Sequence, residues 1–324
     1  MASVRLIITL LATVSLQACA PSYYVNPHAN PQSPELSDNQ LIVEDGTKLP
    51  LRVWRGGALP QAIIVAVHGF NDYRRAFDLP GEFFAQNDIF LYAYDQRGFG
   101  EADGRGLWPG RAYLQTDLIT LVKLVKTEHP GVPVYLLGDS MGGAVVAVTS
   151  LHPDLPKVDG IILNAPAVWG QQTFNVFYRM GLWLLAHTVP WKEVTGKGLN
   201  ITVTDNIPLL KELSNDPLMI RETRIDALYG MVHLMDAVQD VAPKLKTPTL
   251  LLYGLKDEVI PHDSICHFAE QLQQAQQQVI FYEQGYHFLL RDLGAQTVWQ
   301  DILSWVQGDA LALNRQGENA CSEV

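Results

Sequence analysis

The chain has 324 residues, 48% of them hydrophobic, and a formal net charge of −11. This hydrophobic content is enough for one large globular domain, or for one domain that carries an insertion. Binding to the phosphates of nucleic acid needs a basic surface, so the acidic balance argues against a nucleic-acid partner.

Residues 1–19 are expected to be a signal peptide rather than part of the fold. A short positive start precedes an apolar run, Leu6–Leu16, which is too short to span a bilayer as a mature helix. The run ends in Leu16-Gln17-Ala18-Cys19, which resembles the lipobox of bacterial lipoproteins. The resemblance implies that Cys19 is lipidated, becomes the first mature residue and anchors the chain to a membrane. The alternative is an ordinary secretory signal that is cleaved beside this cysteine.

The residues after the cysteine suggest a location and a linker. Ala20, rather than Asp, follows Cys19. In Gram-negative lipoproteins this resembles the pattern of outer-membrane sorting, which implies a lipid-anchored protein of the bacterial cell envelope that faces the periplasm. Residues 20–39 are rich in Pro, Asn and Ser, so we expect a flexible tether there.

Strand and helix patterns alternate along residues 40–167 and again along 242–307. Asp45-Gly46 lies between two short strand patterns, which predicts an antiparallel hairpin at a sheet edge. The continuous apolar runs that follow are typical of buried parallel strands. The alternation predicts an α/β fold with a mostly parallel central sheet flanked by helices. The expected strands are 40–43, 49–54, 62–67, 89–94, 134–137, 158–163, 249–253 and 279–282, and the expected helices are 81–86, 111–128, 141–151, 262–274 and 295–306.

Residues 168–241 interrupt this alternation. The segment has no clear strand pattern and is rich in aromatic and helical residues. An insertion of this length is too long for a loop, so we expect a helical cap between two core strands. The last segment, 308–324, is polar and is expected to be a loose tail.

The motif Gly138-x-Ser140-x-Gly142 lies between an apolar strand and a run of small residues. This context is typical of a nucleophile elbow, in which a strand ends, the chain turns sharply and a helix begins. The turn strains the backbone of the serine, so its close neighbours must be small. The serine then lies at a helix N-terminus, where free N–H groups can stabilise an anion.

A serine nucleophile needs a general base, usually histidine, and a carboxylate that orients the base. In this kind of fold the order is serine, acid, histidine, each in a loop after a strand. Asp257 directly follows an apolar strand, with Glu258 as the fallback acid. His287 follows the last strand and a Gly-Tyr turn. The remaining late histidines, His262 and His267, fall at the start of a helix and within it, so the predicted triad is Ser140, Asp257 and His287.

An earlier strand ends in His68-Gly69-Phe70. The oxyanion hole of such a fold uses the N–H after the nucleophile and one from this loop, which would be those of Met141 and Phe70. His68 is then a structural anchor of the loop rather than a second base. We find no metal motif and no Gly-rich phosphate loop, and the triad needs only water, so no metal and no cofactor are expected.

Two further cysteines, Cys266 and Cys321, could pair in an oxidising periplasm. The alternative is a buried Cys266 on a helix and a free Cys321 in the loose tail. The number of residues between the two cysteines does not decide between these alternatives. The sequence also does not indicate an oligomeric state.

Residues 41–306 resemble the monoacylglycerol lipase and lysophospholipase branch of the α/β-hydrolases, also called the serine aminopeptidase S33-type hydrolases. The resemblance implies an α/β-hydrolase fold, the roles given above for the triad and the oxyanion donors, and a helical cap that shapes an acyl pocket. The sequence departs from the family at 71–73, and its cap is only loosely similar. The motifs that carry the resemblance are His68-Gly69-Phe70-Asn71-Asp72, residues 94–100, Gly138-Asp139-Ser140-Met141-Gly142-Gly143, residues 254–261 and Gly285-Tyr286-His287.

The expected function is hydrolysis of carboxylic esters of single-chain lipids, monoacylglycerol or lysophospholipid, through an acyl-enzyme. The substrate would be a small amphiphilic ester. A proline-iminopeptidase-like peptidase is one alternative, which needs cap acids such as Glu193, Asp205 or Glu212 to capture an amine. A non-catalytic envelope-interaction module on the same fold is the other.

Overall fold

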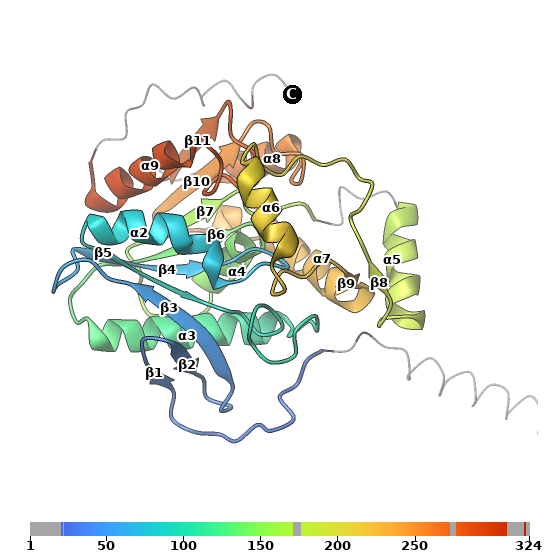
Figure 1. Cartoon of the computed structure of the whole chain (residues 1–324), viewed down its shortest axis with the longest axis horizontal. Helices are drawn as coiled ribbons and strands as arrows, with labels where there is room; N and C mark the ends of the chain where they lie inside the picture. The colour runs from blue at the N-terminus through green and yellow to red at the C-terminus, as the bar shows by residue number, and fades with distance from the viewer. Residues whose placement is uncertain (1–20, 22, 171–175, 273–276, 310–320, 322–324) are drawn as a thin grey trace, which may run out of the picture.

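The computed structural model describes residues 21, 23–170, 176–272, 277–309 and 321. Its centre is a nine-stranded sheet in the order β1-β2-β3-β5-β4-β6-β7-β10-β11, and β8 and β9 form a separate pair (Figure 1). The strands are β1 (Glu35–Leu36), β2 (Gln40–Ile42), β3 (Lys48–Trp54), β4 (Ala62–Val67), β5 (Ile89–Tyr94), β6 (Val134–Asp139), β7 (Gly160–Asn164), β8 (Glu193–Val194), β9 (Thr223–Arg224), β10 (Thr249–Gly254) and β11 (Gln277–Tyr282).

Adjacent strands from β5 to β11 run parallel, whereas β1, β2 and β3 pair antiparallel at one edge and β3 pairs antiparallel with β5. Every residue of β4, β5, β7 and β10 is buried. Strands buried on both faces require helices on both faces, which explains their continuous apolar runs. The predicted mostly parallel sheet and its edge hairpin are confirmed.

Helices cover both faces of the sheet (Figure 1). Side chains of α2 and α9 join one apolar cluster with β4 and β10, and those of α3, α4 and α8 join a second cluster with β6 and β7. Two short 3-10 helices, Arg74–Phe77 and Ala242–Lys244, lie in the connections. The helices are α2 (Asp78–Gln86), α3 (Arg111–Glu128), α4 (Met141–Ser150), α5 (Val176–Thr188), α6 (Ile207–Asn215), α7 (Ile225–Gln239), α8 (His262–Gln271) and α9 (Ala295–Gln307).

The inserted segment consists of α5, α6 and α7 with the short pair β8–β9, which the sequence did not predict. Its helices differ in how they attach. Met231, Leu234 and Val238 of α7 are buried in the same cluster as α4, so α7 is packed as a core helix. In contrast, Ala186 is the buried residue of α5. The cap therefore has a firmly packed base, α7, and an outer helix, α5.

The expectation of a flexible tether over 20–39 needs correction for its described part. Tyr24 is buried, and its N–H donates to the carbonyl of Trp108 at 2.8 Å. The side chain of Asn26 donates to the hydroxyl of Thr47 at 2.9 Å, and β1 pairs with β2. The Pro and Asn content suggested mobility, but the aromatic rings and backbone hydrogen bonds attach this segment to the core.

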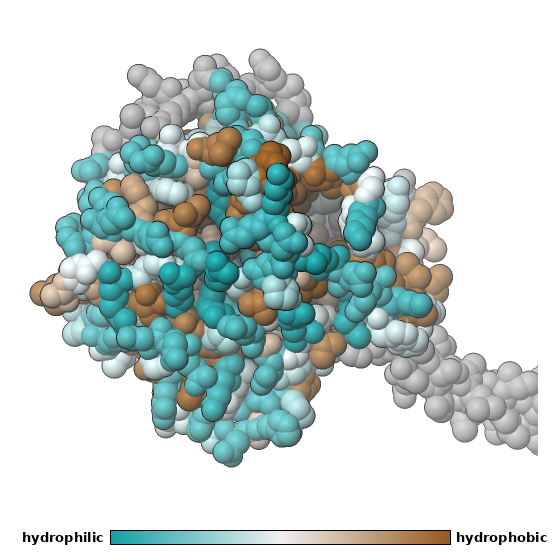
Figure 2. Space-filling model, viewed as in Figure 1, coloured by the Kyte–Doolittle hydropathy of each residue, from teal (hydrophilic) through white to brown (hydrophobic). Residues whose placement is uncertain are grey.

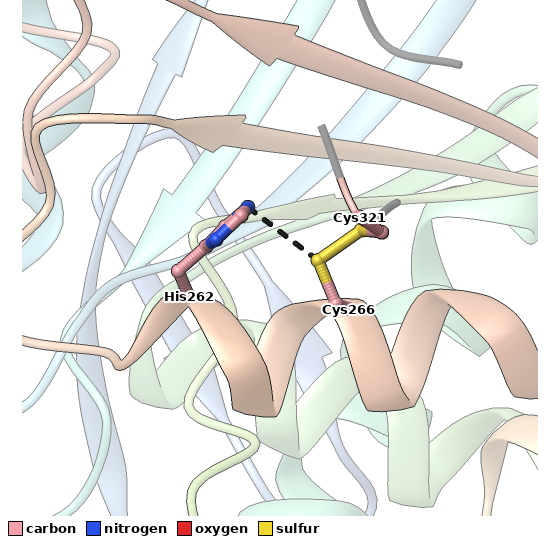
Figure 3. Close-up of side chains that lie close together, drawn as sticks. All are labelled: His262, Cys266 and Cys321. Carbon is pink, nitrogen blue, oxygen red and sulfur yellow. Dashed lines mark hydrogen bonds between the residues drawn. A yellow bond between two sulfur atoms is a disulfide. The ribbon is translucent and has the colours of Figure 1, made fainter. Parts of the chain in front are cut away.

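The C-terminal tail is joined to α8 through Cys321. Cys321 forms a disulfide with Cys266 of α8 (Figure 3), which decides the alternative that the sequence left open and fixes this part of the expected loose tail. The remaining residues beyond Asp309, and the expected signal peptide with Cys19, lie outside the described residues. Among the helices of the described part, none has the length and apolar character needed to cross a membrane.

Candidate active site

Ser140 occupies a strained turn between the end of β6 and the start of α4. Its φ is 52° and its ψ is −113°, in the region that side chains rarely adopt. A Cβ on Gly138 would lie 2.3 Å from the carbonyl oxygen of Gly142, and a Cβ on Gly142 would lie 1.9 Å from that of Val67. Both flanking positions therefore require glycine, as the elbow motif predicts, and the turn exposes the serine side chain above the sheet.

The loops after β10 and β11 bring an acid and a histidine to this serine. The Nε2 atom of His287 lies 3.0 Å from the hydroxyl oxygen of Ser140, and its Nδ1 atom lies 2.7 Å from Oδ2 of Asp257. A carboxylate can only accept a hydrogen bond, so Nδ1 donates to Asp257 and Nε2 of the neutral ring accepts from the serine hydroxyl. The structure thus brings together the three residues singled out in the sequence.

The protonation of His287 is governed by two opposing effects. Burial by itself would lower its pKa, but the charge of Asp257 and its hydrogen bond outweigh burial, so the net pKa is raised above the ordinary value of 6.5. The second oxygen of Asp257 accepts from the N–H groups of Val259 and Ile260 at 2.7 and 3.0 Å. The carboxylate is therefore held with one oxygen facing the imidazole, where it stabilises the protonated ring.

The His68-Gly69-Phe70 loop passes directly beside the serine, because a Cβ on Gly69 would lie 3.4 Å from that of Ser140. The ring of Phe70 packs edge-on against Phe99 and Trp108. Met141 is the first residue of α4, so its N–H has no carbonyl partner within the helix. The site therefore has backbone N–H groups on two sides of the serine.

The ring of His68 forms hydrogen bonds with its own loop and with the loop that follows β5. It is fully buried, its Nε2 accepts from the N–H of Gln96 at 3.0 Å, and its Nδ1 lies 2.8 Å from the carbonyl of Gly69, to which it donates. Burial lowers its pKa, which favours the neutral form that these bonds require. This geometry agrees with the structural role expected from the sequence.

The other acid and the other histidines considered from the sequence do not join the triad. Glu258 is exposed and accepts from the N–H of Thr202 at 2.6 Å. His262 stacks against Tyr253, and His267 interacts with a glutamine one turn farther along α8. Neither histidine is among the hydrogen-bond partners of Ser140 or Asp257.

A buried ion pair beside the triad was missed from the sequence. The guanidinium of Arg291 donates to Asp72 at 2.6 Å, and both side chains are almost fully buried. Asp72 ends the loop that carries Phe70, and Arg291 lies four residues after His287. The pair therefore ties the loop beside the serine to the histidine loop. Asp72 ends one of the motifs given above and Arg291 follows another by four positions, but no local rule pairs charges so far apart in sequence.

A second buried acid lies next to the serine. Asp139 is the last residue of β6 and accepts from the side-chain amide of Asn164 at 2.6 Å. Burial raises its pKa, and the nearby charges of Arg291 and His287 oppose that effect. The carboxylate is held within the buried polar network beneath the turn.

One cluster among the described residues has the composition of a metal site. His262, Cys266 and Cys321 place their possible ligand atoms within 4.8 Å of one another (Figure 3). The two sulfur atoms are bonded to each other, whereas a metal binds cysteine as the thiolate. In this oxidised form the cluster offers the ring of His262 alone.

The greater part of the chain matches a known family. A family model described as "Serine aminopeptidase, S33" matches residues 58–294. The chain belongs to this hydrolase family. Human monoglyceride lipase is 27% identical over 292 residues, which cover 87% of this chain and 94% of that protein. The monoacylglycerol lipase of Mycolicibacterium smegmatis is 24% identical over 282 residues, which cover 83% of this chain and 96% of that protein.

Solved structures share the fold. The monoacylglycerol lipase of Paleococcus ferrophilus has a TM-score of 0.68 at 19% identity, covering 80% of this chain and 98% of that one. A soluble variant of the Saccharomyces cerevisiae monoglyceride lipase has a TM-score of 0.71 at 18% identity, covering 88% and 97%. The S33 family member described here is thus an α/β-hydrolase and a serine ester hydrolase, and the non-catalytic alternative is set aside.

Proposed function

We propose that this hydrolase cleaves the carboxylic ester of a single-chain lipid, a monoacylglycerol or a lysophospholipid, with Ser140 as nucleophile, His287 as base and Asp257 as acid. The observation that carries the proposal is the position of the His287 ring, which lies 2.7 Å from Asp257 and 3.0 Å from Ser140. The curated relatives that span most of this chain include monoglyceride lipases, which supports this substrate class.

The reaction uses two proton transfers through one imidazole. Nε2 of His287 takes the proton of the Ser140 hydroxyl as its oxygen attacks the ester carbonyl. The N–H groups of Phe70 and Met141 stabilise the oxyanion that forms. The imidazolium then gives its proton to the leaving alcohol, which departs and leaves an acyl-enzyme. Water, deprotonated by the same imidazole, attacks the acyl carbon, releases the fatty acid and restores the serine.

The aminopeptidase alternative finds less support in the cap. A peptide amine would need acidic side chains that converge on the site. Asp205 instead accepts from the N–H of Leu293 at 2.8 Å. Glu212 lies 3.6 Å from Arg75, and Glu193 is exposed on β8. The three acids lie at separate places, which favours the ester substrate.

We also propose that the mature protein is a lipoprotein anchored through Cys19, in the outer membrane and facing the periplasm. The lipobox-like Leu16-Gln17-Ala18-Cys19 supports the anchor. The disulfide between Cys266 and Cys321 supports an oxidising compartment, because such bonds persist mainly outside the cytosol.

The activity is tested with p-nitrophenyl esters of increasing chain length and with a monoacylglycerol. Ser140→Ala is expected to lower kcat by about 10⁴-fold or more, because the nucleophile is lost. His267→Ala, a histidine on α8 outside the site, is the matched control and should retain activity. An optimum at medium to long chains supports the lipid substrate, a sharp short-chain optimum contradicts it, and turnover of proline p-nitroanilide alone would favour the peptidase.

A further inference from the structure

Three potential metal ligands outside the active site meet on α8. His262 and Cys266 are four residues apart on this helix, so their side chains lie on one face, one turn apart. Cys321, from beyond α9, is joined to the same face through its disulfide with Cys266 (Figure 3). The potential ligand atoms of the three residues lie within 4.8 Å of one another. The reaction proposed above uses none of the three.

The ring of His262 is already directed at one of the sulfur atoms. Its Nε2 atom lies 3.4 Å from Sγ of Cys266. A nitrogen and a sulfur ligand of a tetrahedral zinc ion, at about 2.1 and about 2.3 Å from it, are separated by roughly 3.6 Å. The ring is held in this direction, because it stacks on Tyr253 and meets Phe281 edge-on, each with ring centroids 5.9 Å apart. One side of a zinc site is therefore already present in the oxidised protein.

The second sulfur atom can complete the site once the disulfide is opened. Two sulfur ligands of a tetrahedral zinc ion are roughly 3.8 Å apart, so the sulfur atoms must separate beyond their bonded distance. Cys266 is buried in the apolar cluster that includes α8, whereas Cys321 lies outside the helices and strands of the described chain. Cys321 is therefore the residue that moves, and the shift leaves α8 in place.

The charge around the cluster favours a cation. The chain has a net charge of −11, and hydrophilic residues cover most of the face drawn in Figure 2. The sequence of α8 contains the acids Asp263 and Glu270 and no lysine or arginine. An acidic surface raises the local concentration of cations. No positive side chain of this helix would repel a metal ion at the cluster.

We propose that His262, Cys266 and Cys321 bind one Zn²⁺ ion when their disulfide is reduced, with water as the fourth ligand. A mixed set of nitrogen and sulfur ligands is typical of zinc. A dithiol supplies the two electrons and two protons: its own sulfurs become a disulfide, and the protein disulfide becomes two thiols. Zinc then releases one proton from each thiol and takes the lone pair of Nε2. The ion replaces the disulfide as the link between Cys321 and α8 in a reducing medium.

Zinc binding is measured on the full chain, either oxidised or reduced. The reductant is a phosphine that is removed before zinc is added, because a dithiol would itself bind zinc. Competition with a chromophoric chelator gives the amount bound, and we expect reduced wild type to bind one ion more per chain than oxidised wild type. Cobalt(II) in place of zinc should give a thiolate-to-cobalt charge-transfer band in the reduced protein. Equal zinc binding in both forms, or no such band, would overturn the proposal.

The ligands are tested one at a time in the reduced protein. We expect His262→Ala and Cys321→Ser each to weaken zinc binding by about 100-fold or more, because one of three protein ligands is lost. His267→Ala, on the same helix but outside the cluster, is the matched control and should bind zinc like wild type. Cys19 is present in every sample, so the differences among them report the cluster. Unchanged affinity in either ligand variant would overturn the site.

A stability measurement distinguishes a folded site from chelation by the unfolded chain. A metal that binds the folded state alone raises the free energy of unfolding. We therefore expect zinc to stabilise reduced wild type against urea, and to leave the double variant Cys266→Ser, Cys321→Ser unchanged. Zinc binding without this stabilisation would overturn the proposal. None of these measurements uses ester hydrolysis, so they succeed or fail independently of the proposed function.

Discussion

Asp257 holds the imidazole of His287 through one oxygen and is itself held by backbone N–H groups through the other. We expect Asp257→Asn to lower kcat/KM by about 10³- to 10⁴-fold, because the amide no longer selects the required tautomer or stabilises the protonated ring. Glu258→Gln, at the neighbouring exposed position, is the control and should retain activity. A large loss in the control with a small loss in Asp257→Asn would contradict the assignment of the acid.

The pH profile of the same variants follows from the raised pKa of His287. The base must be neutral, so wild-type kcat/KM should rise with pH through a midpoint above 6.5. Without the charge of Asp257, burial is left as the larger effect, and burial lowers the pKa of the ring. The acidic limb of Asp257→Asn should therefore move to lower pH. Rates on a soluble short-chain ester from about pH 5 to pH 9 measure the acidic limb of the wild type and that of the variant. A limb that moves to higher pH in the variant would contradict this account.

The buried ion pair of Asp72 and Arg291 is expected to stabilise the fold. Asp72→Ala leaves the guanidinium buried with its nearest counter-ion removed, which costs about 3–5 kcal/mol in such pairs. Asp139 and Asp292 also face Arg291, so we expect the lower end of that range. Adding Arg291→Met should recover part of the loss. Urea unfolding compares the wild type with the single and the double variant, and a loss below about 1 kcal/mol in Asp72→Ala would show that the pair is not needed.

The contrast between these residues shows what a sequence can predict at this scale. Ser140, Asp257 and His287 each follow a buried strand, and parallel strands end at one edge of a sheet, so their meeting could be predicted from order alone. Asp72 lies in the loop after β4 and Arg291 in the His287 loop, but no pattern indicates that a particular aspartate faces a particular arginine. Their pairing depends on how the two loops pack, which is a tertiary property.

At the scale of elements, two glycines in the middle of cap helices provide a matched pair. A Cβ on Gly230 of α7 would lie 2.2 Å from the ring of Trp108, whereas a Cβ on Gly181 of α5 meets nothing within 4 Å. We expect Gly230→Ala to destabilise the fold by about 1–3 kcal/mol through overpacking. Gly181→Ala should be neutral, or stabilise by about 0.5–1 kcal/mol through helix propensity.

Thermal unfolding of both alanine variants measures the difference. Equal effects of the two substitutions would show that α7 is not packed more tightly than α5.

The same contrast explains which features of the cap could be predicted from the sequence. Its helical character could be predicted from composition, but strands of two residues, such as β8 and β9, are too short to have a pattern. The division into a packed base and an outer helix depends on contacts with α4 and Trp108.

At the scale of the whole molecule, the described residues before β2 and the residue Cys321 are joined to the domain more firmly than the composition of these segments indicates. Residues 20–39 have the Pro and Asn content of a linker, yet Tyr24 is buried and β1 extends the sheet. Composition describes the average tendency of a segment, whereas one buried ring and a few backbone hydrogen bonds suffice to attach it. The buried strands β4, β5, β6, β7 and β10 were predictable because each has its own apolar run, while β1 and the disulfide of Cys321 depend on single long-range contacts.

The disulfide between Cys266 and Cys321 spans 55 residues and encloses β11, the His287 loop and α9. Closing a loop of this length restricts the unfolded chain and stabilises the fold by about 4 kcal/mol. We therefore expect reductant to lower the free energy of unfolding of the wild type, measured in urea, by that amount. The double variant Cys266→Ser, Cys321→Ser should start at the reduced wild-type stability and show no response to reductant. An unchanged wild-type stability in reductant would contradict a stabilising role of the disulfide. Because the enclosed segment includes His287, the proposed base, the reduced enzyme should also lose activity at a lower temperature than the oxidised one.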